Sequence, residues 1–264
     1  MTGAALQLVH VRESAPLVQC ITNYVAMNTA ANVLLAAGAS PAMVHAAEES
    51  GEFAAMADAL TVNIGTLSPA WLDGMKCAID GATKAGRPWV LDPVAHFATP
   101  FRRQAVAELL ALKPTIVRGN ASEILALADG QGAGRGVDSG DPVERAEDAA
   151  RRLATRWEVV VAVTGTVDFV TDGVRAARVA GGSALMPQVT ALGCSLTCLI
   201  GAFVGASPLD PFDATVAALA CFAAAGQVAG KISHGPGSFT VNFLDALHAL
   251  DEDALQTHAG IMAA

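Results

Sequence analysis

Short apolar runs alternate with helical patterns along most of this 264-residue chain, and this alternation strongly limits its fold. Consecutive strands joined by helices become parallel neighbours, because each crossover helix returns the chain to the same edge of the sheet. The pattern therefore predicts a mostly parallel central sheet with helices on both faces, a three-layer α/β/α fold. The expected strands are 17–22, 41–44, 60–64, 89–91, 115–117 and 159–163, and the expected helices are 26–37, 50–58, 69–85, 101–112, 121–128 and 142–156.

The pattern changes after residue 165. Residues 169–171 and 175–179 flank Asp172-Gly173, a dipeptide typical of the tight turn of a β-hairpin. Beyond this hairpin the sequence reads almost entirely as helix, over 194–205, 211–230 and 237–250. Neither a repeat nor a long linker interrupts the chain, so we expect a single domain over residues 1–264.

The composition is apolar, with 53% hydrophobic and 16% charged residues. This suits buried parallel strands, or an oligomer that covers further apolar surface. The Ala-rich stretch 214–229 most resembles a membrane span, but Gln227 and its small residues indicate a packed helix. The N-terminus lacks the pattern of a secretion signal, and the five widely spaced cysteines form no CxxC pair. We therefore expect reduced thiols and a cytoplasmic location.

The net charge is −9, from 16 basic and 25 acidic residues, and the basic residues are scattered. This argues against a nucleic-acid partner or an anionic membrane surface. An anionic substrate would instead need backbone N–H groups, a metal ion or an arginine to hold it.

Polar or small residues follow the carboxyl ends of five expected strands. In an open α/β sheet, ligands bind in the crevice outside these ends, so the segments are expected to form one site. They are Thr22-Asn23, Asn63–Thr66, Asp92-Pro93, Arg118–Asn120 and Thr164–Thr166.

The segment 189–197 places one cysteine, Cys194, after a small turn containing Gly193 and before an apolar helix. The first turn of a helix has backbone N–H groups without helical partners, and its dipole favours negative charge. Such a position could hold phosphate oxygens, lower the pKa of the thiol, or do both. The alternative is a buried cysteine at a helix start. Cys198, one turn later, completes no zinc site.

Two carboxylates follow neighbouring strands. Asp92 stands before Pro93, where helix formation is blocked, so it is either a turn residue or a metal ligand. Asn120 and Glu123 have the spacing of a capping box, which would use their side chains structurally. Alternatively, Glu123 and Asp92 hold Mg²⁺ together with phosphate oxygens, while Asn120 and Arg118 contact phosphate.

The segment 129–141 contains five glycines but follows a helix and matches neither a dinucleotide fingerprint nor a P-loop. It is expected to be a surface loop or a lid over a nucleotide. Met43, Met27 and Asn23 could line an apolar pocket with one polar anchor, although a methionine is more often only part of a core.

An ordered set of strings resembles the hydroxyethylthiazole kinase family of thiamine salvage, within the ribokinase-like superfamily. These strings are ITNYVAMNTAANVLLAAGASPAM, LDPVA, RGNASEI, VTGTVDFVTDG and GCSLT, and the resemblance runs from about Pro16 to Leu247. It implies a ribokinase-like three-layer fold. It also implies transfer of the γ-phosphoryl group of ATP to the hydroxyl of 4-methyl-5-(2-hydroxyethyl)thiazole with Mg²⁺, by a homotrimer with sites between subunits.

The resemblance also implies roles for individual residues. Cys194 would stand where most of the superfamily has an aspartate base. The other roles are substrate contact for Met43, Ala191, Gly193 and Asn23, ATP contact for Arg118, Thr164 and Asn120, and magnesium binding for Glu123 and Asp92.

The chain departs from the family pattern in two places. Ala191-Leu192 stands where the family usually has Gly-Thr, so the freedom of glycine at positive φ is lost and Leu192 could narrow the substrate pocket. His96-Phe97 stands where smaller residues are expected. Both departures concern the identity of the acceptor more than the phosphoryl transfer.

Phosphoryl transfer depends mainly on positioning and charge stabilisation. A thiol with a pKa of about 8.5 is only a few per cent ionised at neutral pH; a helix start would raise that fraction and phosphates would lower it. We expect Cys194 to orient the alcohol and partly deprotonate it. Three alternatives stay open: a hydroxymethylpyrimidine or pyridoxal kinase, an ATP-dependent dehydratase of hydrated nicotinamide nucleotides, and a non-catalytic nucleotide or thiazole sensor.

Overall fold

A computed structural model describes residues 3–129, 143–206 and 210–264. In this part of the chain nine strands form one sheet in the order β2-β1-β3-β4-β5-β6-β7-β8-β9. The strands β2-β1-β3-β4-β5-β6 are parallel to one another, and the pairs β6–β7, β7–β8 and β8–β9 are antiparallel. The strands are β1 Leu17–Ile21, β2 Ser40–Ala42, β3 Ala59–Asn63, β4 Trp89–Asp92, β5 Ile116–Asn120, β6 Val160–Thr164, β7 Val167–Thr171, β8 Ala176–Ala180 and β9 Gly260–Ala263.

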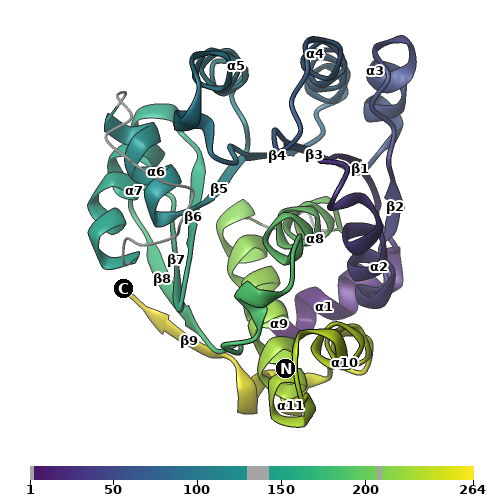
Figure 1. Ribbon diagram of the computed structural model, residues 1–264, viewed down its shortest axis with the longest axis vertical. Helices are drawn as coiled ribbons and strands as arrows, with labels where there is room; N and C mark the ends of the chain where they lie inside the picture. Colours follow the sequence, from purple (N-terminus) through teal and green to yellow (C-terminus); the bar gives the residue numbers. More distant parts are fainter. Residues whose placement is uncertain (1–2, 130–142, 207–209) are drawn as a thin grey trace.

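Helices cover both faces of this sheet, which curves around α8 and α9 (Figure 1). The outer layer consists of α3 Ala47–Met56, α4 Pro69–Lys84, α5 Pro100–Leu110, α6 Ala121–Asp129 and α7 Val143–Trp157. The inner layer consists of α1 Gly3–Ser14, α2 Met27–Ala37, α8 Leu192–Ala206, α9 Pro211–Ile232, α10 Pro236–His248 and α11 Glu252–His258. In the described residues, two short 3₁₀ helices, η1 His96–Ala98 and η2 Met186–Gln188, are also present.

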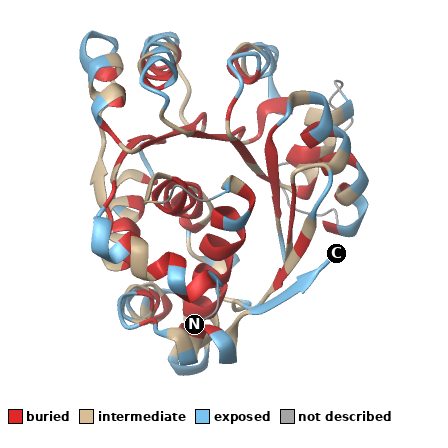
Figure 2. Ribbon diagram, turned by 180° about the vertical axis from the view of Figure 1, so that it is seen from behind, coloured by how far each residue is buried: buried red, intermediate tan, exposed pale blue. Residues whose placement is uncertain are grey.

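Each face of the sheet has its own apolar core, as expected for parallel strands between two helical layers. Helices α8 and α9 form the centre of the inner core, and Figure 2 shows both as largely buried. In the described part of the chain, α9 is the one helix long and apolar enough to cross a membrane, with a mean hydropathy of 1.5. Because 83% of its most apolar window is buried inside the protein, α9 is a core helix here.

The α/β class, the parallel sheet and the hairpin are confirmed, with most strand and helix boundaries within three residues of those expected. The segment after the hairpin is almost entirely helical, as expected, but the strand β9, which pairs with the edge of β8, was not anticipated. All four residues of β9 are exposed, so the strand has no alternating pattern to detect. Helix α1 was also not expected.

The start of the helix around Cys194 also differs from expectation. It begins at Leu192 and not at Cys194, and Leu192 is buried in the inner core. The preceding Ala191 has a φ of 69°, a left-handed conformation that sets the start of α8. Cys194 is therefore the third residue of α8.

In the strand order 2-1-3-4-5, the direction in which successive strands are added to the sheet reverses between β1 and β3. Open α/β sheets bind their ligands at such a position. Asn23 follows β1, Asn63 ends β3, and Asp92 ends β4. The crevice at this edge is therefore the expected location of the functional site.

Candidate active site

Polar side chains stand at the carboxyl ends of adjacent strands. Asn63 of β3 is the register partner of Asp92 of β4, and Asn120 of β5 is the partner of Thr164 of β6. The fold thus brings together the strand-end residues that the sequence predicted to converge. Met43 follows the edge strand β2 at the same end of the sheet, beyond Asn23.

Asp92 is fully buried, and its two oxygens have different surroundings. Its Oδ2 accepts hydrogen bonds from Asn63 Nδ2 at 2.7 Å and Thr197 Oγ1 at 2.8 Å, and lies 3.6 Å from a guanidinium nitrogen of Arg118. Its Oδ1 is buried without a hydrogen-bond partner among the described residues. Burial raises the pKa of Asp92, while Arg118, Thr197 and Asn63 oppose the rise. The unpaired oxygen is a free ligand atom.

Glu123 is buried at the start of α6. Its Oε1 accepts from the backbone N–H of Ala95 and its Oε2 from that of Asn120, both at 2.9 Å. Asn120 Oδ1 in turn accepts from the backbone N–H of Glu123 at 2.9 Å. These two reciprocal bonds are the expected capping box, which holds the Glu123 carboxylate in one orientation at the crevice.

The two carboxylates are close enough to influence each other electrostatically. Burial raises the pKa of Glu123, and the negative charge of Asp92 raises it further. A bound cation would relieve this repulsion. The described residues contain no group of three or more metal-ligating side chains, so a metal would complete its shell with phosphate oxygens and water. Magnesium suits such a donor set of oxygens, and the residues present fit it.

Arg118 lies at the centre of the polar cluster. One of its terminal nitrogens donates to Thr164 Oγ1 at 2.6 Å, and the hydroxyl of Thr164 donates to the carbonyl of Gly119 at 3.3 Å. The guanidinium also lies against the backbone of Gly193, where a β-carbon would stand 3.1 Å from Arg118 Nη2. The absence of a side chain at Gly193 therefore lets α8 approach the arginine closely.

A cavity of about 910 Å³ opens beside this cluster. Arg118, Asn120, Thr164 and Asp168 form its polar part, whereas Met186, Leu196 and Phe222 are among the residues of its apolar part. Such a combination suits a ligand that has a charged end and an aromatic or aliphatic end. Leu192 lines this cavity as well, so it faces the side where Arg118 and Thr164 lie.

Cys194 is half-buried in the first turn of α8, and its Sγ accepts a hydrogen bond from Asn23 Nδ2 at 3.2 Å. Burial and the nearby charge of Asp92 raise the pKa of the thiol to about 11, although Asn23, Arg118 and Asn63 oppose the rise. The net pKa is therefore raised, opposite to the lowering that a helix start alone would produce. At neutral pH the sulfur carries a proton.

Three other residues singled out from the sequence have different surroundings. Met43 is half-buried and packs against the inner core. The carbonyl of Ala191 accepts from the backbone N–H of Ser195 at 2.9 Å and from its hydroxyl at 2.8 Å. His96 is buried in η1, where burial lowers its pKa, and it does not line the cavity.

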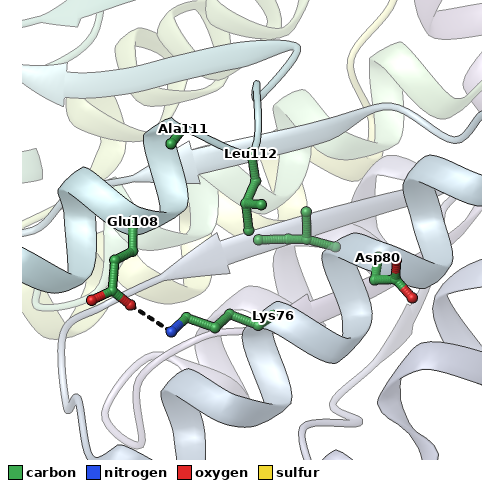
Figure 3. A pocket seen from close by; sticks show the side chains of 6 residues that line it. Lys76, Asp80, Glu108, Ala111 and Leu112 are labelled. Carbon is green, nitrogen blue, oxygen red and sulfur yellow. Dashed lines mark hydrogen bonds and ion pairs between the residues drawn. The ribbon is translucent and has the colours of Figure 1, made fainter.

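A second cavity, of about 430 Å³, lies between α4 and α5 (Figure 3). Lys76 and Glu108 form an ion pair at its rim, and Ile79 and Leu112 contribute apolar surface. Its lining residues come from the middle of α4 and from the end of α5. It contains none of the strand-end residues.

Asn63 and Asp168 are among the site residues that were missed as individual candidates. Asn63 lies within a strand-end segment that the sequence pointed out, but its role depends on neighbours from β1 and β4. Asp168 accepts from the backbone N–H of Gly165 at 2.9 Å, and burial raises its pKa to about 6. The sequence signal for Asp168 was its place four residues after Thr164, across a tight turn. The glycine-rich segment 129–141 lies almost entirely outside the described residues.

Comparison with solved structures defines the class of protein. Pyridoxal kinase from Staphylococcus aureus, in complex with ADP, superimposes with a TM-score of 0.65 over 94% of this chain and 98% of that protein. At 16% identity this likeness concerns the fold alone. Together with the mostly parallel sheet, it defines a ribokinase-like fold.

Closer comparisons define the family. The profile of the Hydroxyethylthiazole kinase family matches residues 8–253, and the chain belongs to this family. It is 71% identical over 262 residues to a hydroxyethylthiazole kinase of Rhizobium johnstonii, covering 99% of this chain and 97% of that protein. One of Cereibacter sphaeroides (strain KD131) is 65% identical over the full length of both. The structure of a hydroxyethylthiazole kinase protein from Pyrococcus horikoshii OT3 is 40% identical and superimposes with a TM-score of 0.92 over the full length of both chains.

Proposed function

We propose that this chain is an ATP-dependent kinase that phosphorylates the hydroxyl group of 4-methyl-5-(2-hydroxyethyl)thiazole in thiamine salvage. Membership of the hydroxyethylthiazole kinase family supports the choice of acceptor. The observation that carries the proposal is the arrangement of Asp92, Glu123 and Arg118 between a large cavity and the thiol of Cys194. This arrangement offers a cation site and an anion site next to a group that can contact an alcohol.

On this proposal, ATP occupies the cavity of about 910 Å³, with its phosphates at the polar end. Arg118, held by Thr164, contacts the phosphates, and its planar guanidinium suits paired hydrogen bonds with their oxygens. Asn120 stabilises the orientation of Glu123 through the capping box, in addition to lining the cavity. The backbone N–H groups at Gly193 and the first turn of α8 add partial positive charge for the transferring group.

Asp92 and Glu123 would hold magnesium, Asp92 through its unpaired Oδ1 and Glu123 directly or through water. When bound, the metal ion supplies positive charge that neutralises the phosphate oxygens. The carboxylates themselves stay fixed, because backbone N–H groups, Asn63 and Thr197 hold them.

The thiazole would lie at the ends of β2, β1 and β3, with its hydroxyl directed to Cys194. Met43 would provide apolar contact, and Asn23, Ala191 and Gly193 would border the acceptor. Because the pKa of Cys194 is about 11, only roughly one thiol in ten thousand is ionised at pH 7. Cys194 therefore orients the hydroxyl in most molecules and accepts its proton in the small ionised fraction, while positioning and charge provide most of the rate.

We further propose a single domain that acts in the cytoplasm as a homotrimer with sites between subunits. Tyr24 and Val25, which directly follow Asn23, are 65% and 59% exposed. A neighbouring subunit placed over these two side chains would cover apolar surface and close the acceptor side of the crevice. Light scattering coupled to size-exclusion chromatography tests this: a trimer is expected, and a stable monomer with full activity would contradict it.

One assay tests the activity. The purified protein is incubated with ATP and Mg²⁺ and with a panel of alcohols that contains the thiazole, hydroxymethylpyrimidine and pyridoxal, and ADP is followed. ADP is expected with the thiazole. ADP formed only with another alcohol would assign a different acceptor. Binding of the thiazole without ADP would favour a sensor.

A further inference from the structure

Asn63 lies in the middle of a chain of hydrogen bonds that crosses the candidate site. Its Nδ2 donates to Asp92 Oδ2 at 2.7 Å, and its Oδ1 accepts from Asn23 Nδ2 at 3.0 Å. The same Nδ2 of Asn23 lies 3.2 Å from Cys194 Sγ. The carboxylate of Asp92 and the thiol of Cys194 are thus linked through two buried amides, contributed by the ends of β3 and β1.

Backbone groups determine which way both amides point. The backbone N–H of Gly65 donates to Asn63 Oδ1 at 2.9 Å, and the backbone N–H of Ala26 donates to Asn23 Oδ1 at 3.0 Å. If either amide were flipped, its NH₂ group would face a backbone donor and leave that donor unpaired. Each Nδ2 must therefore point along the chain, toward Asp92 in one case and toward Cys194 in the other.

The loop after β3 also leaves space for this chain of bonds. A β-carbon on Gly65 would stand 2.7 Å from both Cβ and Nδ2 of Asn23. The loop can therefore approach Asn23 closely only because residue 65 has no side chain. Asn23 is held from two sides, by the backbone of Gly65 and by the amide of Asn63.

We propose that Asn63 is a positioning residue for phosphoryl transfer, which couples the Asp92 carboxylate to the Cys194 thiol through Asn23. Asn63 contacts neither the acceptor nor ATP. It uses its donor to hold Oδ2 of Asp92, so that Oδ1 faces the crevice, and its acceptor to hold the amide of Asn23 against Sγ. One side chain thereby fixes both the carboxylate beside the phosphates and the thiol beside the alcohol. This inference rests on the kinase activity proposed above.

The test compares Asn63→Ala with the wild type and with Asn242→Ala. The control removes an amide on α10 that donates one side-chain bond, to Ser233 Oγ at 2.9 Å, outside the candidate site. Displacement of catalytic groups by about 1 Å can cost about 100-fold in rate, so Asn63→Ala is expected to lower kcat by about 10–100-fold. The KM values for ATP and the alcohol are expected to stay within about threefold, since no direct contact is lost. A kcat equal to that of the control would overturn the proposal.

A second readout does not require activity. Cys194 and the exposed Cys77 are alkylated with iodoacetamide at pH 8 without ATP or alcohol, and the rates are followed by mass spectrometry. Without Asn63, Asn23 loses its anchor and donates less well to Sγ, so the thiolate of Cys194 is less stabilised. The rate at Cys194 relative to Cys77 is expected to fall by about threefold or more. An unchanged or higher ratio would contradict the coupling. A wild type that produces no ADP would instead contradict the kinase activity, and the alkylation ratio would still test the coupling.

Gly65→Ala provides an independent variant that keeps Asn63 and displaces Asn23. It is expected to reproduce the lower kcat and the slower alkylation of Cys194. Should Asn63→Ala fail to fold, Gly65→Ala and Asn63→Ser take its place in both measurements, with the same expected directions. Wild-type values of kcat and of the alkylation ratio in these variants would overturn the proposal.

Discussion

Arg118 and Gly193 are in direct van der Waals proximity: a β-carbon on Gly193 would lie 3.1 Å from Nη2 and 3.2 Å from Nη1 of the guanidinium. The first turn of α8 therefore packs directly against the arginine that, on our proposal, contacts the phosphates of ATP. A residue in a regular helix seldom needs to be glycine for its backbone conformation. Position 193 therefore requires glycine because the guanidinium of Arg118 leaves little room for a side chain.

Gly193→Ala is expected to raise the KM for ATP by about 3–30-fold, because the methyl group displaces the guanidinium by a few tenths of an ångström. Thermal stability should stay equal or rise slightly, since alanine favours the helix by up to about 1 kcal/mol. Steady-state kinetics with varied ATP, together with a melting curve, measure both effects. Gly237→Ala in α10, where an added β-carbon meets no atom within 4 Å, is the control. An unchanged KM for ATP in Gly193→Ala would show that this contact does not matter for the nucleotide.

Glu123→Ala is expected to raise the Mg²⁺ concentration needed for half-maximal rate by about 10–100-fold, the usual effect of removing a group that orients a metal site. The same change leaves the backbone N–H groups of Ala95 and Asn120 unpaired, so stability should fall by about 1–3 kcal/mol. A magnesium titration at saturating ATP measures the first effect. Glu108→Ala, which removes a carboxylate on α5 outside the site, should leave the titration unchanged. A wild-type titration curve for Glu123→Ala would count against a role in metal binding.

Cys194→Ala is expected to lower kcat by about 10²–10⁴-fold, the range for loss of a group that transfers a proton. Asp92, Asn23, Arg118 and Asn63 surround the thiol, and the net result of burial and of these neighbours is a pKa of about 11. Since the ionised fraction grows with pH below that value, kcat of the wild type should rise between pH 7 and pH 9, whereas that of Cys194→Ala should not. Rate measurements at saturating substrates over this range provide the check. Wild-type turnover in Cys194→Ala would exclude the role.

The sequence predicted the layers of the fold and the region of the site well, and the individual contacts less well. The strand–helix alternation and the hairpin turn are local signals, and both were correct. The exposed edge strand β9 has no such signal, because it exists only through pairing with β8. The sequence also left two roles open for Asn120 and Glu123, and the structure contains the capping box while directing the carboxylate to the crevice.

The electrostatics of the site depend on burial, which the sequence does not contain. A cysteine at a helix start suggested a lowered pKa as one of two opposing effects, but the depth of Cys194 and the charge of Asp92 raise it instead. The role of Asn63 depends on three strands meeting at one edge. Leu192 could be noticed as a departure from the family pattern, yet only the fold places it on the side of Arg118 and Thr164.

Ala191→Gly is expected to stabilise the protein by up to about 1 kcal/mol. Ala191 has a φ of 69°, in the left-handed region that a residue with a β-carbon occupies at a cost. Glycine relieves this strain, although its more flexible unfolded state offsets part of the gain. Denaturant unfolding at 25 °C measures the difference. A loss of stability would show that contacts of the alanine methyl group outweigh the strain.

Asp168→Asn is expected to stabilise the protein at pH 8 by about 1–3 kcal/mol, with the gain disappearing at pH 4. Burial raises the pKa of Asp168 in the folded state to about 6 from 3.8. The proton is thus held more tightly in the folded state, and this stabilisation is complete below about pH 4 and lost as pH rises through 6. An asparagine can still accept from the backbone N–H of Gly165 and carries no charge.

The neighbouring Asp172 provides a control of opposite sign. Burial opposes its ionisation, but hydrogen bonds from Val174 and Arg175 outweigh this and lower its pKa. Asp172→Asn should therefore destabilise the protein at pH 8 and keep most of this deficit at pH 4, because the pKa of Asp172 in the folded state lies below its ordinary value of 3.8. Urea unfolding of the wild type and of both variants at pH 4, 6 and 8 compares the two carboxylates directly. An Asp168→Asn variant that is less stable than the wild type at pH 8 would contradict this prediction. It would show that the contacts of the Asp168 carboxylate stabilise the folded protein by more than its ionisation there costs.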